Sequence, residues 1–590
     1  MRAFSCAAVL GVLAACGSNS KDHGELVAIE IEPANATLAY TGTPTSIEYT
    51  ALGRFADGST EPLDDVTFRL DLDATKLGAL EDTTFTASGN AAGKGGVFAE
   101  RGDLTGSTSV IVTVHTTDLG PGVPADGADR FPDTSPAGAM SQTIVYPLDG
   151  AVMPSSVKAP DVQWEGPTAG EDLYRVRLTA GFATVDKIVA GGPDFTFHAL
   201  PTEAEWALLK TSAGNGTIQI SVDHWDATNG PHGGAPVDVK MVPADITGAI
   251  YYWNLEAGRM ERIDAMGRAP AIANPPAPPS NPNNRCVACH TVSRDGRYLS
   301  AELWGGGAEG AVFDLADPNV RTGDPAPTVA PLIEGSTYRA LFSTFNPDAS
   351  RLLINNGTRL ELIDPRSGAP VLTSGTALPI SGAAHPSWSP DGSTIAFVRN
   401  VMNGAAPATW AVDYTRGDLG LIPVTGPDSF GDAVTIVDSA NVDPAFVAPS
   451  WPTWAPDSQW IAYGAGVNSR GRNDGIPAVY PGSLFIVNKA GGPPIRLDIA
   501  CGNVRDCHLP NFSPYDAGGY FWLVFYSTRD YGNALAGTKG RQRRQLWVTA
   551  IDKAKLAAGE DASSVAYWLP DQDVQAQNMS AYWAPPAPIQ

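Results

Sequence analysis

The chain has 590 residues, with 63 acidic against 39 basic side chains and a formal charge of −24. A surface of this sign repels nucleic acid, which excludes a nucleic-acid-binding protein. The length favours several domains, and 62 glycines and 49 prolines with few long helical patterns predict an all-β architecture.

The first sixteen residues have the layout of an export signal. Ala3 to Ala15 is an apolar run of small residues, shorter than the roughly 20 that span a bilayer. It ends in Leu13-Ala14-Ala15-Cys16, which resembles the lipobox of bacterial lipoproteins. The resemblance implies loss of residues 1–15, lipid on Cys16 and a tether over 16–25. The alternative is an ordinary secretory signal that ends at a cysteine.

The lipid would be the protein's link to a membrane. Because Gly17 rather than Asp follows Cys16, the pattern resembles lipoproteins of the outer membrane. We therefore expect a cell-envelope protein that faces the periplasm or the cell surface.

Two strand-rich segments follow the tether. Residues 26–115 alternate apolar and polar side chains between Pro and Gly turns, which predicts a β-sandwich. Its order of features resembles bacterial Ig-like domains. Residues 116–141 have a linker composition. Residues 142–246 are weakly similar to a fibronectin type III sandwich, with one helix opened by the capping box Thr202 to Glu205. Its His198 and His224 are expected at the surface rather than on a metal.

Residues 248–590 contain a repeat. Its fullest copies are Pro386-Ser387-Trp388-Ser389-Pro390-Asp391-Gly392 and Pro452-Thr453-Trp454-Ala455-Pro456-Asp457-Ser458, and further copies begin at Ser343 and Pro510. The copy at His290 has Arg294 where the others have Pro, and the copy at Ala581 is cut short by the C-terminus. Each full copy leads into apolar strands, which is typical of propeller blades. The Asp of the turn is expected to be structural.

These copies resemble the repeats of TolB and related periplasmic propellers. The segment 249–263 has the pattern of two strands whose blade lacks its beginning, and the copy at Ala581 supplies only an innermost strand. Joining the two ends gives a composite blade. The expected fold class is therefore all-β, with two Ig-like sandwiches followed by a six-bladed β-propeller that this composite blade closes.

The strongest chemical motif is Cys286-Val287-Ala288-Cys289-His290, the c-type haem attachment pattern. The two thiols, Cys286 and Cys289, are spaced to bind the vinyl groups of one porphyrin, and His290 is then the proximal iron ligand. We therefore expect one haem c per chain. The alternatives are a Cys286–Cys289 disulfide, and a zinc site that Cys507 and His508 would have to complete.

The sixth iron ligand is expected from the residues just before other innermost strands. Met579 is the first candidate, because its blade neighbours that of the motif, and His508 and His385 are the alternatives. An iron left open is the remaining possibility. The other cysteines, Cys501 and Cys507, are expected to form a disulfide across their short loop.

No hydrolase elbow, P-loop or dinucleotide fingerprint is present, so an electron carrier or a binding protein is favoured over an enzyme. The predicted function is electron transfer or redox sensing with a redox partner protein in the envelope. The rival hypothesis is a propeller scaffold without haem, like TolB, that binds a protein or glycan partner.

Overall fold

The structure is a computed structural model that describes residues 24–587 except 193–195, 247, 305–308, 333–338, 358, 409–412, 471–481, 503–505 and 536–542. Their regular secondary structure is almost entirely strand, with a few short helices. Contacts divide the chain into one unit that ends at Thr116 and a second that begins at Thr117. Within the described residues, no helix has the length and apolarity needed to cross a membrane.

The first unit is built from short strands that bury alternate side chains. In its longest strand, Val110, Val112 and Val114 are fully buried while the residues between them are not. This is the period-2 pattern of a strand with one face on a core. The elements are β1 (Leu26–Glu32), β2 (Ala36–Tyr40), β3 (Ser46–Glu48), β4 (Thr50–Phe55), β5 (Thr60–Pro62), β6 (Thr67–Leu70), α1 (Ala74–Leu77), β7 (Gly78–Glu81), β8 (Thr84–Ala87), β9 (Gly93–Arg101) and β10 (Leu104–Leu119).

The second unit opens with two facing groups of strands. One group has the order β12-β19-β17-β14-β15 and the other has the order β11-β13-β16. Helix α2 (Glu203–Ala213) begins at Thr202 with the predicted capping box, in which Glu205 N donates to Thr202 Oγ1 at 3.2 Å. The strands are β11 (Thr143–Tyr146), β12 (Ala151–Pro154), β13 (Val162–Glu165), β14 (Leu173–Ala180), β15 (Ala183–Ala190), β16 (His198–Ala199), β17 (Thr217–Asp226), β18 (Gly230–Gly233) and β19 (Val237–Val242).

One expectation about this region was wrong. His224 is fully buried, with Nε2 2.6 Å from Asp172 Oδ1, because it shares the apolar face of β17 with Ile220 and Val222. His198 is exposed, as expected. The segment expected as a linker is also packed in part, since Phe131 is buried against Leu173 and Ile188.

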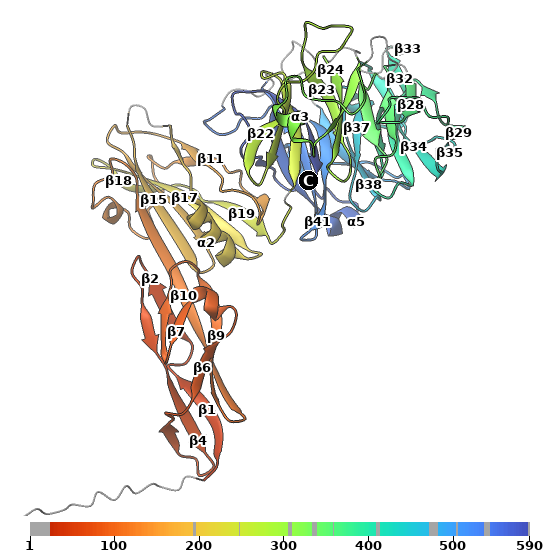
Figure 1. Ribbon diagram of the computed structural model, residues 1–590. Coiled ribbons are helices and arrows are strands. Elements are labelled where there is room, and N and C mark those ends of the chain that lie inside the picture. Colours follow the sequence, from red (N-terminus) through yellow and green to blue (C-terminus); the bar gives the residue numbers. More distant parts are fainter. Residues whose placement is uncertain are drawn as a thin grey trace, which may run out of the picture. The chain divides into compact units, whose positions relative to one another are not determined.

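In the rest of the second unit, the described residues form six separate sheets, coloured green to blue in Figure 1. The innermost strand of each sheet contacts the innermost strand of the next, in the order β23, β26, β31, β37, β41, β45, and β45 contacts β23. The series of inner strands therefore returns to its start. Such sheets arranged around a centre form a β-propeller.

Three of these sheets are made of consecutive strands, and a fourth skips only β29, which belongs to the next sheet. They consist of β23 (Val287–Val292), β24 (Tyr298–Leu303) and β25 (Gly310–Asp314); β26 (Phe342–Phe345), β27 (Leu352–Asn355), β28 (Arg359–Ile363) and β30 (Ile380–Ser381); β37 (Ala448–Trp454), β38 (Trp460–Gly466), β39 (Ser483–Asn488) and β40 (Ile495–Arg496); and β41 (Cys507–Ala517), β42 (Tyr520–Ser527), β43 (Gln545–Asp552) and β44 (Tyr567–Trp568). The sheet between β30 and β37 has β31 (Ala384–Trp388), β32 (Thr394–Asn403), β34 (Arg416–Gly426) and β36 (Val434–Val437) as its main strands, with the short β29 (Ser374–Gly375), β33 (Ala406–Pro407) and β35 (Ser429–Phe430) at its margins.

The remaining sheet joins the two ends of this region. Its order is β22-β21-β20-β45, formed by β20 (Ala249–Asn254), β21 (Arg259–Asp264), β22 (Gly267–Ile272) and β45 (Asn578–Ala584). Strand β45 pairs antiparallel with β20, so that Ile250 lies opposite Trp583. The short helices of the region are α3 (Pro318–Thr322), α4 (Asp498–Cys501) and α5 (Lys553–Ala557).

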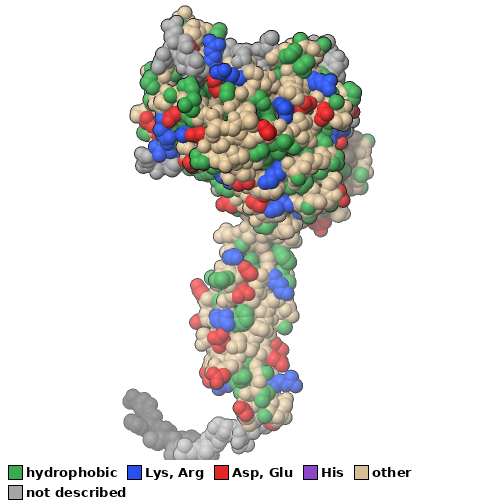
Figure 2. Space-filling view, turned by 90° about the vertical axis from the view of Figure 1, so that its right-hand side faces the viewer, with side chains coloured by type: hydrophobic (Ala, Val, Ile, Leu, Met, Phe, Trp, Pro, Cys, Tyr) green, Lys and Arg blue, Asp and Glu red, His purple; other side chains and the backbone are tan. Residues whose placement is uncertain are grey.

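The repeat turns have the structural role that was predicted. Asp391 Oδ1 accepts hydrogen bonds from Ser389 Oγ at 2.6 Å and from Ser393 N at 2.9 Å, which fixes the turn between β31 and β32. On the described part of the face shown in Figure 2, acidic and basic side chains are interspersed, so charge of one sign does not gather there.

Candidate functional site

A central cavity of about 150 Å³ is enclosed by the six inner strands. Each inner strand contributes one segment to the lining of the cavity, and the six segments cover the same positions of the repeat. The segments are 289–294, 342–347, 385–390, 451–456, 509–514 and 580–585, of which Asn346 and Ala455 do not line the cavity. The cavity therefore has one end at the start of the inner strands, near Cys289, and another at their final turns, near Arg294.

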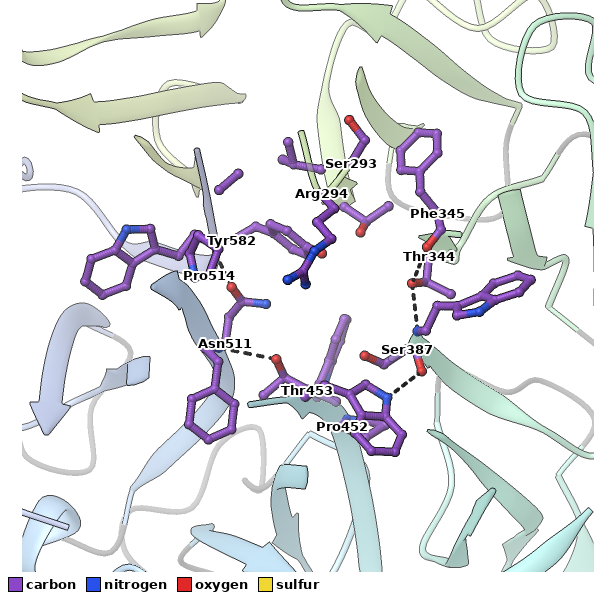
Figure 3. Close-up of a pocket in the computed structure, with 18 of the residues that line it drawn as sticks. Ser293, Arg294, Thr344, Phe345, Ser387, Pro452, Thr453, Asn511, Pro514 and Tyr582 are labelled. Atoms are coloured by element: carbon purple, nitrogen blue, oxygen red, sulfur yellow. Dashed lines mark hydrogen bonds between the residues drawn. The ribbon is translucent and has the colours of Figure 1, made fainter. Parts of the chain in front are cut away.

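Side chains in the middle of the strands tie neighbouring sheets together. Trp388 N donates to Thr344 Oγ1 at 3.0 Å, and Phe512 N donates to Thr453 Oγ1 at 3.3 Å. Trp583 N donates to Asn511 Oδ1 at 2.7 Å in the same way. Figure 3 shows the three accepting residues, Thr344, Thr453 and Asn511, around the centre of the ring. In these three copies the second residue of the repeat, Thr344, Thr453 or Asn511, is therefore polar because its side chain accepts a hydrogen bond from the backbone of the next inner strand.

The haem motif lies in and just before β23. Val287 pairs with Leu303 and His290 with Ala301, so three steps along β23 match two along β24 and the strand has a bulge. The extra residue interrupts the regular alternation of side chains along the motif, and both Cys289 and His290 line the central cavity. His290 Nε2 lies 3.4 Å from the carbonyl oxygen of Tyr251 in the neighbouring sheet.

Both motif thiols are held in their neutral form. Burial raises the pKa of the Cys289 thiol, and the charge of the fully buried Glu302 adds to the shift. The same two causes raise the pKa of Cys286. Since the thiolate is the reactive form, these cysteines are not activated nucleophiles.

The candidate sixth ligands occupy different surroundings. His385 lines the central cavity with Cys289 and His290, whereas His508 and Met579 do not. Met579 Sδ instead accepts a hydrogen bond from Arg544 Nη1 at 3.2 Å. His508 Nε2 lies 3.1 Å from Ser469 O and 3.2 Å from Ser450 Oγ.

His385 presents an unprotonated ring nitrogen. Tyr414 donates its only hydroxyl proton to Pro449 O at 2.7 Å, so its oxygen must accept from His385 Nδ1, 3.0 Å away. Burial lowers the pKa of His385 well below its usual value, which keeps the ring neutral. Nε2 then carries a lone pair, and it is buried without a hydrogen-bond partner. Metal-binding histidines are oriented in the same way, through their other ring nitrogen.

The second cysteine pair lies beside β41. Cys501 and Cys507 are both buried, and Arg529 Nη2 donates to Cys507 Sγ at 3.4 Å. The disulfide between them stays a prediction. Cys16 and the signal segment lie outside the described residues.

One cluster of three possible metal ligands occurs among the described residues, Asp172, His224 and Asp226. Both carboxylates already accept hydrogen bonds from backbone N–H groups, from Ala169 and Gly170 in one case and Thr228 and Asn229 in the other. This cluster is satisfied by the protein and is a structural feature of the sandwich. Cys507 and His508 form no such cluster with the motif among the described residues.

Sequence comparisons found no family model and no curated protein that match the chain. Solved structures that resemble it include a putative TolB from Agrobacterium tumefaciens, with 17% identity over 57% of this chain and 99% of that one, and a TM-score of 0.31. A DUF4784 family protein from Bacteroides caccae has 9% identity over 76% of this chain and 100% of its own, with a TM-score of 0.29. The dihydro-haem d1 dehydrogenase NirN has 10% identity over 57% and 74%, with a TM-score of 0.27. Identities and TM-scores this low support no conclusion about function. The β-propeller is defined by the arrangement of sheets described above.

The buried His508 makes stability depend on pH. Burial lowers its pKa from 6.5 to about 4. Between these values the unfolded chain binds a proton that the folded protein does not, so the free energy of unfolding falls as pH falls, by about 3 kcal/mol in total. We expect urea unfolding of His508→Asn to show a shallower loss of stability over this pH range than the parent. Equal pH dependence in the two proteins would contradict the assignment to His508.

Proposed function

We propose that this chain is an envelope lipoprotein anchored through Cys16, with a bacterial Ig-like domain, a fibronectin type III-like sandwich and a six-bladed propeller closed by the sheet of β20 and β45. In this proposal the propeller carries one haem c on Cys286 and Cys289 for electron transfer or redox sensing. The supporting observation is that Cys289 and His290 of the motif line the same cavity as His385, whose Nε2 is buried and unpartnered.

The fit to a haem differs among the motif residues. Cys289 and His290 line the central cavity, whereas Cys286 precedes β23 and does not line it. His290 Nε2 contacts Tyr251 O at 3.4 Å. Binding of iron by His290 Nε2 would therefore replace this contact.

The central cavity also limits where such a group would lie. About 150 Å³ is below the roughly 300–1,000 Å³ of pockets that enclose small-molecule ligands. A porphyrin on Cys286 and Cys289 would thus cover the end of the cavity rather than fill it. The bound group would supply one-electron chemistry, and the chain's part is to hold it through the two sulfurs and to offer His290 and a sixth ligand. His385 has a free lone pair for that role; Met579 and His508 would first have to leave their present contacts.

The test is absorbance and covalent haem stain of the full chain, purified from cells competent for cytochrome c maturation. We expect a Soret band and a stain that survives SDS. Cys286→Ser with Cys289→Ser should remove both signals, while the matched control Cys501→Ser with Cys507→Ser should keep them. A colourless parent protein would overturn the proposal. Met579→Ala, His508→Ala and His385→Ala would then be compared by spectrum to assign the sixth ligand.

A second candidate is a propeller scaffold that binds a protein or glycan partner, with Cys286 and Cys289 joined in a disulfide. The observation that favours it is the central cavity itself, to which all six inner strands contribute. Mass spectrometry after alkylation separates the two hypotheses. A disulfide protects Cys286 and Cys289 until reduction, whereas thioether-linked haem stays on the peptide after reduction.

A further inference from the structure

Arg294 departs from the repeat at a position that faces the cavity. The five equivalent residues are Pro347, Pro390, Pro456, Pro514 and Pro585, and all six line the cavity at the final turns of the inner strands. A proline presents an apolar ring without charge. One copy in six therefore places a cation at an otherwise apolar end of the cavity.

The guanidinium of Arg294 points into the ring of inner strands. Figure 3 shows it reaching from the end of β23 toward Ser387, Thr453 and Asn511. The side chain is exposed to the cavity, and among the described residues no carboxylate pairs with it. The described lining also contains no Asp or Glu, although the whole chain carries −24.

Polar groups around Arg294 are oriented as donors. Trp583 N can only donate, so its 2.7 Å bond fixes Oδ1 of Asn511 on that side and turns the amide N–H groups away from it. Thr453 Oγ1 accepts from Phe512 N, which leaves its hydroxyl proton to be donated elsewhere. The backbone bonds between inner strands thus leave two side chains of the cavity lining with N–H or O–H groups available to donate to a ligand.

We propose that this end of the cavity is a binding site for a small oxyanion, a carboxylate or phosphate group. Arg294 supplies the charge and a planar pair of donors, a geometry that matches the two oxygens of such a group. Asn511 and Thr453 supply further hydrogen bonds. A site without acidic lining concentrates an anion locally even on a protein of negative net charge. A cavity of about 150 Å³ admits a small ion or the charged end of a larger ligand.

The turn that holds Arg294 permits a matched variant. Gly296 N donates to Ser293 O at 2.9 Å, and Gly392 N donates to Ser389 O at 3.0 Å in the copy that contains Pro390. The two turns are therefore closed by equivalent backbone hydrogen bonds. Arg294→Pro therefore restores the residue that the other copies carry and removes the cation while the turn is kept.

The experiment is calorimetric titration of the full chain at low salt with inorganic phosphate, acetate and the neutral acetamide, with the fluorescence of Trp388 and Trp454 as a second signal. We expect saturable binding of at least one anion, none of acetamide, at least a tenfold loss in Arg294→Pro and a smaller loss in Arg294→Lys. Arg294→Pro should melt at or above the parental temperature. A peptide with a free carboxylate and its amidated form distinguish a chain terminus from a free ion.

The outcome does not depend on the haem. Cys286→Ser with Cys289→Ser should leave anion affinity unchanged, because Arg294 lies at the other end of β23. Failure of every anion to bind the parent, equal binding of acetamide, or unchanged affinity in a folded Arg294→Pro would each overturn the proposal.

Discussion

Removing residues 578–590 is expected to abolish cooperative unfolding of the second unit. The deletion takes away β45 and leaves one edge of β20 unpaired. It also removes the buried side chains Trp583 and Ala584 and the partner that Trp583 N provides to Asn511. Truncation of a buried tryptophan alone costs about 3–5 kcal/mol, a large part of the 5–15 kcal/mol that stabilises a typical domain.

Calorimetry of the full chain provides the measurement. Deletion of 588–590 alone is the control, because every described pair of β45 remains. Trp583→Ala should shift the transition of the second unit downward without removing it. A 578–590 deletion that melts with parental enthalpy at the parental temperature would show that β45 does not complete the ring of inner strands.

Arg175→Met is expected to destabilise the sandwich of the second unit by about 3–5 kcal/mol. Arg175 and Asp223 are cross-strand neighbours on β14 and β17, both buried, and form an ion pair through Arg175 Nη2 and Asp223 Oδ2. The substitution leaves a buried carboxylate that accepts a hydrogen bond from the Ser135 hydroxyl at 3.1 Å but has lost its cationic partner. Stability is lost because the buried carboxylate of Asp223 keeps its charge with neither a cationic partner nor water to compensate it.

The double variant Arg175→Met with Asp223→Leu separates this cause from lost packing. Since it removes both charges, urea unfolding should show most of the lost free energy restored. If the double variant is as unstable as Arg175→Met alone, the buried charge is not the source of the loss.

Local sequence patterns predicted much of the fold. The repeat of Trp388 and its equivalents identified the inner strands, and the copy at Ala581 suggested the pairing of Trp583 with the start of the region. Burial of His224 was missed, although it follows Ile218, Ile220 and Val222 at every second position, because its partner Asp172 is 52 residues away. A histidine on an apolar strand face was itself a signal of burial.

The candidate site was harder to predict because one extra residue decides it. The spacing of Cys286, Cys289 and His290 is visible in sequence, but the bulge in β23 between Val287 and His290 depends on pairing with β24. The same is true of Glu302, which acts on both thiols from β24. The Arg294 exception was visible in the repeat, but its meaning required knowing that this position faces the axis.

The pairing of β20 with β45 also has a kinetic consequence. More than three hundred residues separate the two strands in sequence, so their contact is among the least local in the molecule. Non-local strand pairing slows folding because the intervening chain must be ordered before the contact forms. Until β45 has been synthesised and has reached its place, β20 presents an open backbone edge able to pair with another chain. Protection of β20 amides from hydrogen exchange should accordingly appear late in refolding, and aggregation should compete with this last step.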